Sequence, residues 1–144
     1  MYLANQKPFT EKDETMKRET ISYTTPDKAI LQEAVAVLQS GGVVAFPSDT
    51  SYGLAADPQN PAAMERLFLI KGRPADMAVS CIFRTIEEAS LWAEVGSRER
   101  EILEANLPGP FTFLLPPTAS YPLPGARVGV RIPDCCFTKM LSNA

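Results

Sequence analysis

The stretch G-G-V-V-A-F-P-S-D-T-S-Y-G-L, residues 41–54, carries the strongest fold signal in the chain. Its two glycines are typical of a helix end, and the short apolar run 43–46 is typical of a strand covered on both faces. Pro47 then stops the strand, and residues 48–53 form a loop rich in hydroxyl groups. The stretch therefore predicts a buried strand that leads directly into a polar loop.

Strand and helix patterns alternate outward from this stretch. Apolar residues at helical spacing predict helices, and Thr25, Asn60, Thr85, Ser97 and Asp134 are the residues expected to begin them. Shorter apolar or alternating runs predict further strands at 21–23, 78–83, 111–115 and 127–133. This alternation predicts a single α/β domain.

Length and composition agree with one globular domain. The chain has 144 residues, of which 45% are hydrophobic and 22% charged. Residues 1–20 carry mixed charges and almost no apolar periodicity, so we expect a flexible tail there, with Met16 as an alternative start. The ordered domain is then expected over residues 21–144.

Several function classes are excluded by composition. A net charge of −3 leaves no global electrostatic footprint for nonspecific nucleic-acid binding. No apolar run approaches the ~20 residues that span a membrane, and we expect a cytoplasmic protein. The absence of histidine excludes Ser-His-Asp and Cys-His catalysis as well as His-ligated metals. No metal site is predicted, and the three cysteines, Cys81, Cys135 and Cys136, are expected to be structural or incidental.

Two cations mark the expected end of the helix that begins at Asn60. Lys71 and Arg73 flank Gly72, which permits a sharp reversal, and Pro74 follows. One interpretation is a solvated helix end whose charges complement the helix dipole. The other is a pair of cations that binds the phosphates of a nucleotide.

Further polar residues allow the same two kinds of interpretation. Ser48 and Tyr52 belong either to an ordinary turn or to a loop that presents hydroxyls and a ring to a small polar substrate. Arg127 and Arg131 are four residues apart on an expected strand, so both would project from one face. They are either solvated or share an anionic ligand.

Taken together, four blocks of sequence resemble the YrdC-like family. The blocks, in order, are G-G-V-V-A-F-P-S-D-T-S-Y-G-L, K-G-R-P-A-D, L-P-G-P-F-T-F-L-L and R-V-G-V-R-I-P-D. The resemblance implies a twisted, open mixed sheet with flanking helices around a positively charged cavity. It also implies L-threonylcarbamoyladenylate synthase activity, which converts L-threonine, bicarbonate and ATP to threonylcarbamoyl-AMP and pyrophosphate for tRNA modification. Mg²⁺ would accompany the ATP.

The resemblance assigns roles to six residues of this chain. Lys71 and Arg73 would bind the ATP phosphates and carry catalysis, and Arg127 would contact the nucleotide. The implied threonine contacts are Ser48, Tyr52 and Arg131. A histidine that some members place after the K-G-R-P block is replaced by Ile82.

The family pattern continues with a strand that ends in S-x-N, which residues 142–144 do not match. The resemblance therefore implies a domain that is incomplete at its C-terminus.

An alternative function is a non-catalytic YrdC-like module that binds nucleotide, tRNA or double-stranded RNA. A third is a YrdC-like part of a larger carbamoyl-transfer protein. In the enzymatic reading, the expected partners are the downstream enzymes that transfer threonylcarbamoyl to tRNA.

Overall fold

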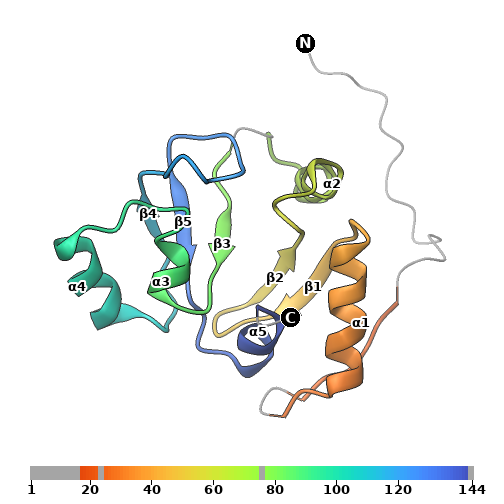
Figure 1. Ribbon diagram of the computed structural model, residues 1–144. Helices are drawn as coiled ribbons and strands as arrows, with labels where there is room; N and C mark the ends of the chain where they lie inside the picture. The colour runs from red at the N-terminus through yellow and green to blue at the C-terminus, as the bar shows by residue number, and fades with distance from the viewer. Residues whose placement is uncertain (1–16, 23–24, 75–76, 143–144) are drawn as a thin grey trace.

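A computed structural model describes residues 17–22, 25–74 and 77–142. Its helices flank two small sheets that lie side by side (Figure 1). The expected mixed α/β architecture is confirmed, although the strands divide between two sheets rather than one. The described residues exclude most of the expected tail and the alternative start at Met16. They also exclude Tyr23 of the expected strand 21–23, and Ile21 and Ser22 belong to no strand.

The first sheet is a β-hairpin made from the opening stretch. β1 (Val44–Pro47) pairs antiparallel with β2 (Tyr52–Ala55), and Phe46 lies opposite Gly53. Our prediction of a strand covered on both faces was wrong, because only Phe46 of β1 is buried. The predicted loop is also shorter: residues 48–51 form the turn, and Tyr52 already belongs to β2.

The second sheet has the order β3-β5-β4 and mixes both directions of pairing. β3 (Ser80–Ile82) runs parallel to β5 (Val128–Arg131), whereas β4 (Phe113–Leu115) runs antiparallel to it. Because β5 is central, its first three residues are fully buried. Arg127 precedes this strand, so it does not share a strand face with Arg131 as we expected.

Helix α1 (Lys28–Gln39) begins later than the sequence predicts. Its N-cap is Asp27, whose carboxylate accepts a 2.7 Å hydrogen bond from the Ala29 amide. Thr25, the expected cap, instead contacts the hydroxyl of Ser22 at 3.0 Å. A carboxylate two positions later is thus the group that satisfies the free amides of the first turn.

Helix α2 (Pro61–Lys71) confirms the prediction at both ends. The Asn60 side chain caps it by accepting from the Ala62 and Ala63 amides, and Pro61 occupies the first position. Gly72 ends the helix in the left-handed conformation at φ 59°, which favours glycine. Lys71 is therefore the last helical residue, as expected.

The remaining helices are short, and three of their predicted ends were wrong. Thr85 caps α3 (Ile86–Ala89) as predicted, but this helix stops before Leu91 and Trp92. The N-cap of α4 (Ser97–Asn106) is Gly96 rather than Ser97, and that of α5 (Cys136–Leu141) is Cys135 rather than Asp134. Neither of these two caps makes a side-chain hydrogen bond, so no local polar signal marks it.

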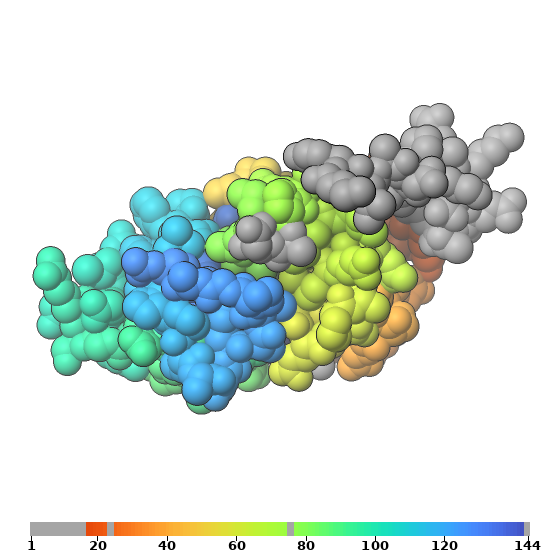
Figure 2. Space-filling view, turned by 90° about the horizontal axis from the view of Figure 1, so that it is seen from above, coloured from red at the N-terminus to blue at the C-terminus, as the bar shows by residue number. Residues whose placement is uncertain are grey.

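Two hydrophobic clusters support the two sheets. The larger cluster packs α3 and α4 against the mixed sheet and is built from ten buried residues: Cys81, Phe83, Ile86, Ala89, Ala93, Leu103, Leu107, Val128, Val130 and Ile132. The smaller one lies around the hairpin, α1 and α5 and has four: Ala34, Phe46, Cys135 and Phe137. The proline-rich segment 116–127, blue in Figure 2, lies against α2, where Phe68 and Leu123 line one small pocket.

Candidate functional site

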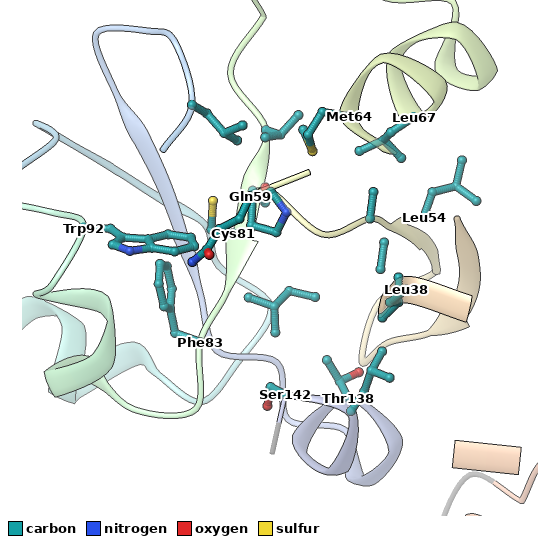
Figure 3. Close-up of a pocket in the computed structure, with 18 of the residues that line it drawn as sticks. Leu38, Leu54, Gln59, Met64, Leu67, Cys81, Phe83, Trp92, Thr138 and Ser142 are labelled. Atoms are coloured by element: carbon teal, nitrogen blue, oxygen red, sulfur yellow. The ribbon is translucent and has the colours of Figure 1, made fainter. Parts of the chain in front are cut away.

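A cavity of about 430 Å³ lies between the hairpin, α2, α5 and the mixed sheet. Figure 3 shows Cys81, Phe83 and Trp92 on one side of it, and Leu54, Met64 and Leu67 on the other. Most lining side chains are apolar, and the charged ones among the described residues are Lys71 and Glu88. The positively charged cavity that the family resemblance implies stays a prediction.

Lys71 reaches this cavity from the end of α2. It is half-buried, and burial together with the nearby Arg73 cation lowers the pKa of its amine below the usual value. Arg73 is exposed beyond Gly72, and its amide closes the helix end by donating to the Phe68 carbonyl at 3.1 Å. Neither side chain forms an ion pair with another described residue, so both charges are available to an anion.

Ser48 organises the turn that joins the two hairpin strands. Its hydroxyl donates to the Ser51 carbonyl at 2.7 Å and accepts from the Thr50 and Ser51 amides at 3.3 Å. The same oxygen lies 3.2 Å from the Thr50 hydroxyl. The ordinary turn role left open by the sequence is thus present, and it fixes the place of the Ser48 hydroxyl.

Arg131, at the end of β5, contacts this turn. Its Nη2 atom donates to Asp49 Oδ1 at 2.7 Å and to Thr50 Oγ1 at 2.8 Å. The other oxygen of Asp49 accepts from the Asp134 amide at 3.1 Å. The structure therefore brings Ser48 and Arg131 into one hydrogen-bonded cluster, with Asp49 and Thr50 between them.

Two opposing effects act on the Asp49 carboxyl. Its burial alone would raise the pKa, but the hydrogen bond from the Asp134 amide and the Arg131 guanidinium together lower the pKa below its usual value. Asp49 is consequently an anion at neutral pH. It pairs with Arg131 through a contact of 2.7 Å.

Tyr52 and Arg127 remain apart from this cluster. Tyr52 begins β2 opposite Pro47, and 81% of its surface is exposed. Arg127 is also exposed and has no ion-pair partner among the described residues. Of the six residues predicted for the site, Lys71 is the one that lines the cavity within the described part of the chain.

Sequence reasoning missed the polar contact between Cys81 and Tyr121 beside the cavity. Burial raises the pKa of the Cys81 thiol to about 11 and that of Tyr121 to about 12. Both groups are therefore neutral at pH 7, and Cys81 behaves as the structural cysteine that the sequence predicts. Cys135 is buried as well, whereas Cys136 is exposed.

Comparison with known families decides the identity of the fold. The Sua5/YciO/YrdC family, whose description reads "Telomere recombination", matches residues 36–144. The chain belongs to this family. The match contains the hairpin turn, α2 and β5, so every predicted site residue of this Sua5/YciO/YrdC protein lies within it.

Relatives of this Sua5/YciO/YrdC chain share the same region. A Xanthomonas euvesicatoria protein named threonylcarbamoyl-AMP synthase is 37% identical over 99 residues, covering 67% of this chain and 53% of that protein. The chain thus spans about half the length of the relatives it matches.

Solved structures of this family have the same fold. Escherichia coli YciO superposes with a TM-score of 0.74 at 27% identity, covering 83% of this chain and 60% of YciO. P. abyssi Sua5, solved in complex with L-threonine, gives a TM-score of 0.75 at 28% identity and covers 83% of this chain and 36% of Sua5. The predicted family and fold class are both confirmed.

Proposed function

We propose that this chain carries part of a threonylcarbamoyl-AMP synthase. The reaction joins L-threonine, bicarbonate and ATP to give threonylcarbamoyl-AMP and pyrophosphate, for modification of tRNA in the cytoplasm. The observation that carries the proposal is the sequence match to a protein named for this product. The fold it shares with a Sua5 that binds L-threonine supports the same substrate.

Lys71 and Arg73 are proposed to hold the triphosphate. Their positions at the end of α2 place two cations within one turn, and neither has a described ion-pair partner. Cations so placed stabilise the negative charge that develops on departing pyrophosphate. The lowered pKa of Lys71 would return toward its usual value once phosphate is bound, because an anion favours the charged amine.

Ser48, Arg131 and Tyr52 are proposed to contact L-threonine. Ser48 and Arg131 already share a hydrogen-bonded cluster, which supports a common ligand for the two side chains. Tyr52 is exposed at the start of β2 and would add a ring face. Arg127, exposed just before β5, is proposed to contact the nucleotide.

The chemistry proceeds in two balanced steps. The threonine amine attacks bicarbonate, and water leaves as the carbamate forms. A carbamate oxygen then attacks the α-phosphorus of ATP, and the bond to the β-phosphate oxygen breaks to release pyrophosphate. Positioning and charge stabilisation are enough for these steps, so no histidine is needed.

A magnesium ion would arrive with ATP rather than occupy a site built by the protein. Among the described residues, no group of three or more Cys, Asp or Glu side chains gathers where a metal could bind. We propose that the phosphate oxygens and water supply most of its ligands, as is usual for Mg²⁺ bound with a nucleotide. The described helices also include none that is long and apolar enough to cross a membrane.

Pyrophosphate release tests the proposal, using the complete reading frame that contains this chain. We expect release from ATP that requires both L-threonine and bicarbonate. Lys71→Ala or Arg73→Ala should lower the rate about a hundredfold. The exposed Lys28→Ala on α1 is the matched control and should leave the rate unchanged. Release that persists without threonine contradicts the proposal.

The alternative function is a non-catalytic module that binds nucleotide or RNA. Salt-dependent binding of tRNA or double-stranded RNA without pyrophosphate release would favour it over the synthase. In the enzymatic case, addition of a threonylcarbamoyl-transfer enzyme and tRNA should consume the product. Detection of threonylcarbamoyladenosine in that tRNA would test whether the transfer enzyme uses the product of this protein.

A further inference from the structure

The pairing of Arg131 with Asp49 is the most buried ion pair among the described residues. The exposed fractions of the two side chains are 19% and 10%, whereas each of the other pairs has at least one partner more than a third exposed. A pair withdrawn from water contributes little net stability, because desolvation offsets the attraction. Stability alone therefore does not account for this ion pair, one member of which, Arg131, is a candidate threonine contact.

The guanidinium of Arg131 is held from one side only. Its Nη2 has two N–H groups, and they are taken by Asp49 Oδ1 at 2.7 Å and Thr50 Oγ1 at 2.8 Å. Nε is buried without a hydrogen-bond partner, and Nη1 has none among the described residues. The side chain is thus oriented while three of its five N–H donors remain unused.

Asp49 is itself fixed in place. Its second oxygen accepts from the Asp134 amide at 3.1 Å, so the carboxylate joins the hairpin turn to the chain just beyond β5. Thr50 extends the cluster to Ser48, since their hydroxyl oxygens are 3.2 Å apart. Two of the three groups proposed to contact threonine, Ser48 and Arg131, are therefore aligned by one carboxylate and one hydroxyl.

We propose that Asp49 is a positioning residue for the amino-acid substrate. It holds Nη2 of Arg131, so that the two N–H groups of Nη1 are left to bind the carboxylate of L-threonine. A carboxylate accepts charge-assisted hydrogen bonds from a guanidinium held in this way. The inference rests on the proposed function for the identity of the substrate, and it assigns Asp49 and Thr50 a role that the sequence reasoning did not give them.

The test measures L-threonine binding directly by calorimetry, again with the complete reading frame. Asp49→Asn keeps the size of the side chain but removes its charge, and it should weaken threonine binding about tenfold. The affinity for ATP should change by less than about twofold. Asp27→Asn is the matched control: asparagine caps α1 as well as aspartate does, so both affinities should be unchanged.

A double-mutant cycle separates positioning from general damage to the fold. In an Arg131→Ala background, Asp49→Asn should change threonine affinity by less than about twofold, because Asp49 acts through Arg131. Thr50→Val removes only one acceptor of Nη2 and should weaken binding about threefold. This variant keeps the test decisive if Asp49→Asn fails to fold.

Three outcomes with the variants would overturn the inference. They are unchanged threonine affinity in folded Asp49→Asn, an equal loss of ATP affinity, and a tenfold effect that persists without Arg131. Threonine binding without pyrophosphate release would contradict the proposed synthase activity. The double-mutant cycle would still test the role of Asp49 in that case. Absence of threonine binding by the unmodified protein would overturn both.

Discussion

The mixed-sheet half and the hairpin half of the molecule are supported in different ways. The mixed sheet, with α3 and α4, packs around ten buried residues. The hairpin, with α1 and α5, packs around four. Since burial of apolar surface is the main source of stability, the hairpin half has much less of its own. Yet the candidate threonine contacts Ser48 and Tyr52 lie on it.

Polar contacts compensate in part for the smaller apolar core of the hairpin half. The Pro47 carbonyl at the end of β1 accepts from the Thr138 hydroxyl at 3.2 Å and lies 3.5 Å from the Cys135 sulfur. Arg131 contacts the turn that follows. The hairpin is thus held in part by side chains from the end of the described chain, so its order should depend on them as well as on its small core.

The largest expected effect is on the mixed-sheet core. Leu103 is 1% exposed, and Leu103→Ala should lower the free energy of unfolding by about 3 kcal/mol because it leaves a cavity. Urea denaturation measures this loss. The neighbouring Ile102 on α4 is 44% exposed, so Ile102→Ala should change stability by less than about 0.5 kcal/mol. Equal losses from the two variants would show that burial of Leu103 in the mixed-sheet core is not the source of the effect.

A smaller loss is expected in the hairpin. A Cβ atom at Gly53 would lie 2.6 Å from the Phe46 ring, so Gly53→Ala should destabilise by about 1–3 kcal/mol. Hydrogen exchange should show faster exchange of the β1 and β2 amides, with β5 unaffected. Combining the change with Phe46→Leu should recover part of the loss. Faster exchange throughout both halves would show that the hairpin does not open separately.

The end cap of α2 gives a third, smaller effect. Asn60→Ala removes the side-chain acceptor for two amides and should cost about 1 kcal/mol. Thermal unfolding checks this value. Asn60→Asp retains a capping oxygen and should be close to neutral. If Asn60→Asp lost as much stability as Asn60→Ala, capping of the helix would not be the way in which Asn60 stabilises the protein.

The smallest effect is a pH dependence at the Arg131 contact. Because the folded pKa of Asp49 is lowered, its charge contributes stability that is fully present above the unfolded pKa of about 4. The contribution is lost as pH falls through the lower folded pKa. The stability difference between the protein and Asp49→Asn should thus be constant from pH 7 to about 5 and shrink below about 4. Denaturation at several pH values measures it, and a constant difference down to pH 3 would contradict this account.

Local sequence signals predicted the parts of the fold that local interactions determine. α2 was predicted at both ends because Asn60, Pro61 and Gly72 act within one turn of the helix. Thr85 was recognised as a cap for the same reason. At Gly96 and Cys135 the helix begins without any side-chain cap, so tertiary packing rather than a polar residue sets the boundary.

The site could be predicted only as separate pieces. Lys71, Ser48 and Arg131 were each identified, but the contact of Arg131 with Asp49 joins residues 82 apart in sequence. No local pattern indicates such a pairing, and Asp49 looked like an ordinary turn residue. The apolar lining of the cavity was not predicted, because it comes from both sheets and four helices, whose relative placement no single segment determines.

The hydrogen bond from Thr138 to Pro47 also sets an order of events during synthesis. Its partners are 91 residues apart, so β1 is made long before the residue that holds its last carbonyl. At roughly 5–20 residues per second, the ribosome needs about 5–18 s to cover that distance. For most of this interval neither α5 nor Arg131 has been made, so the nascent hairpin cannot contact them. The segment with the candidate threonine contacts is therefore made well before the residues that hold it in place.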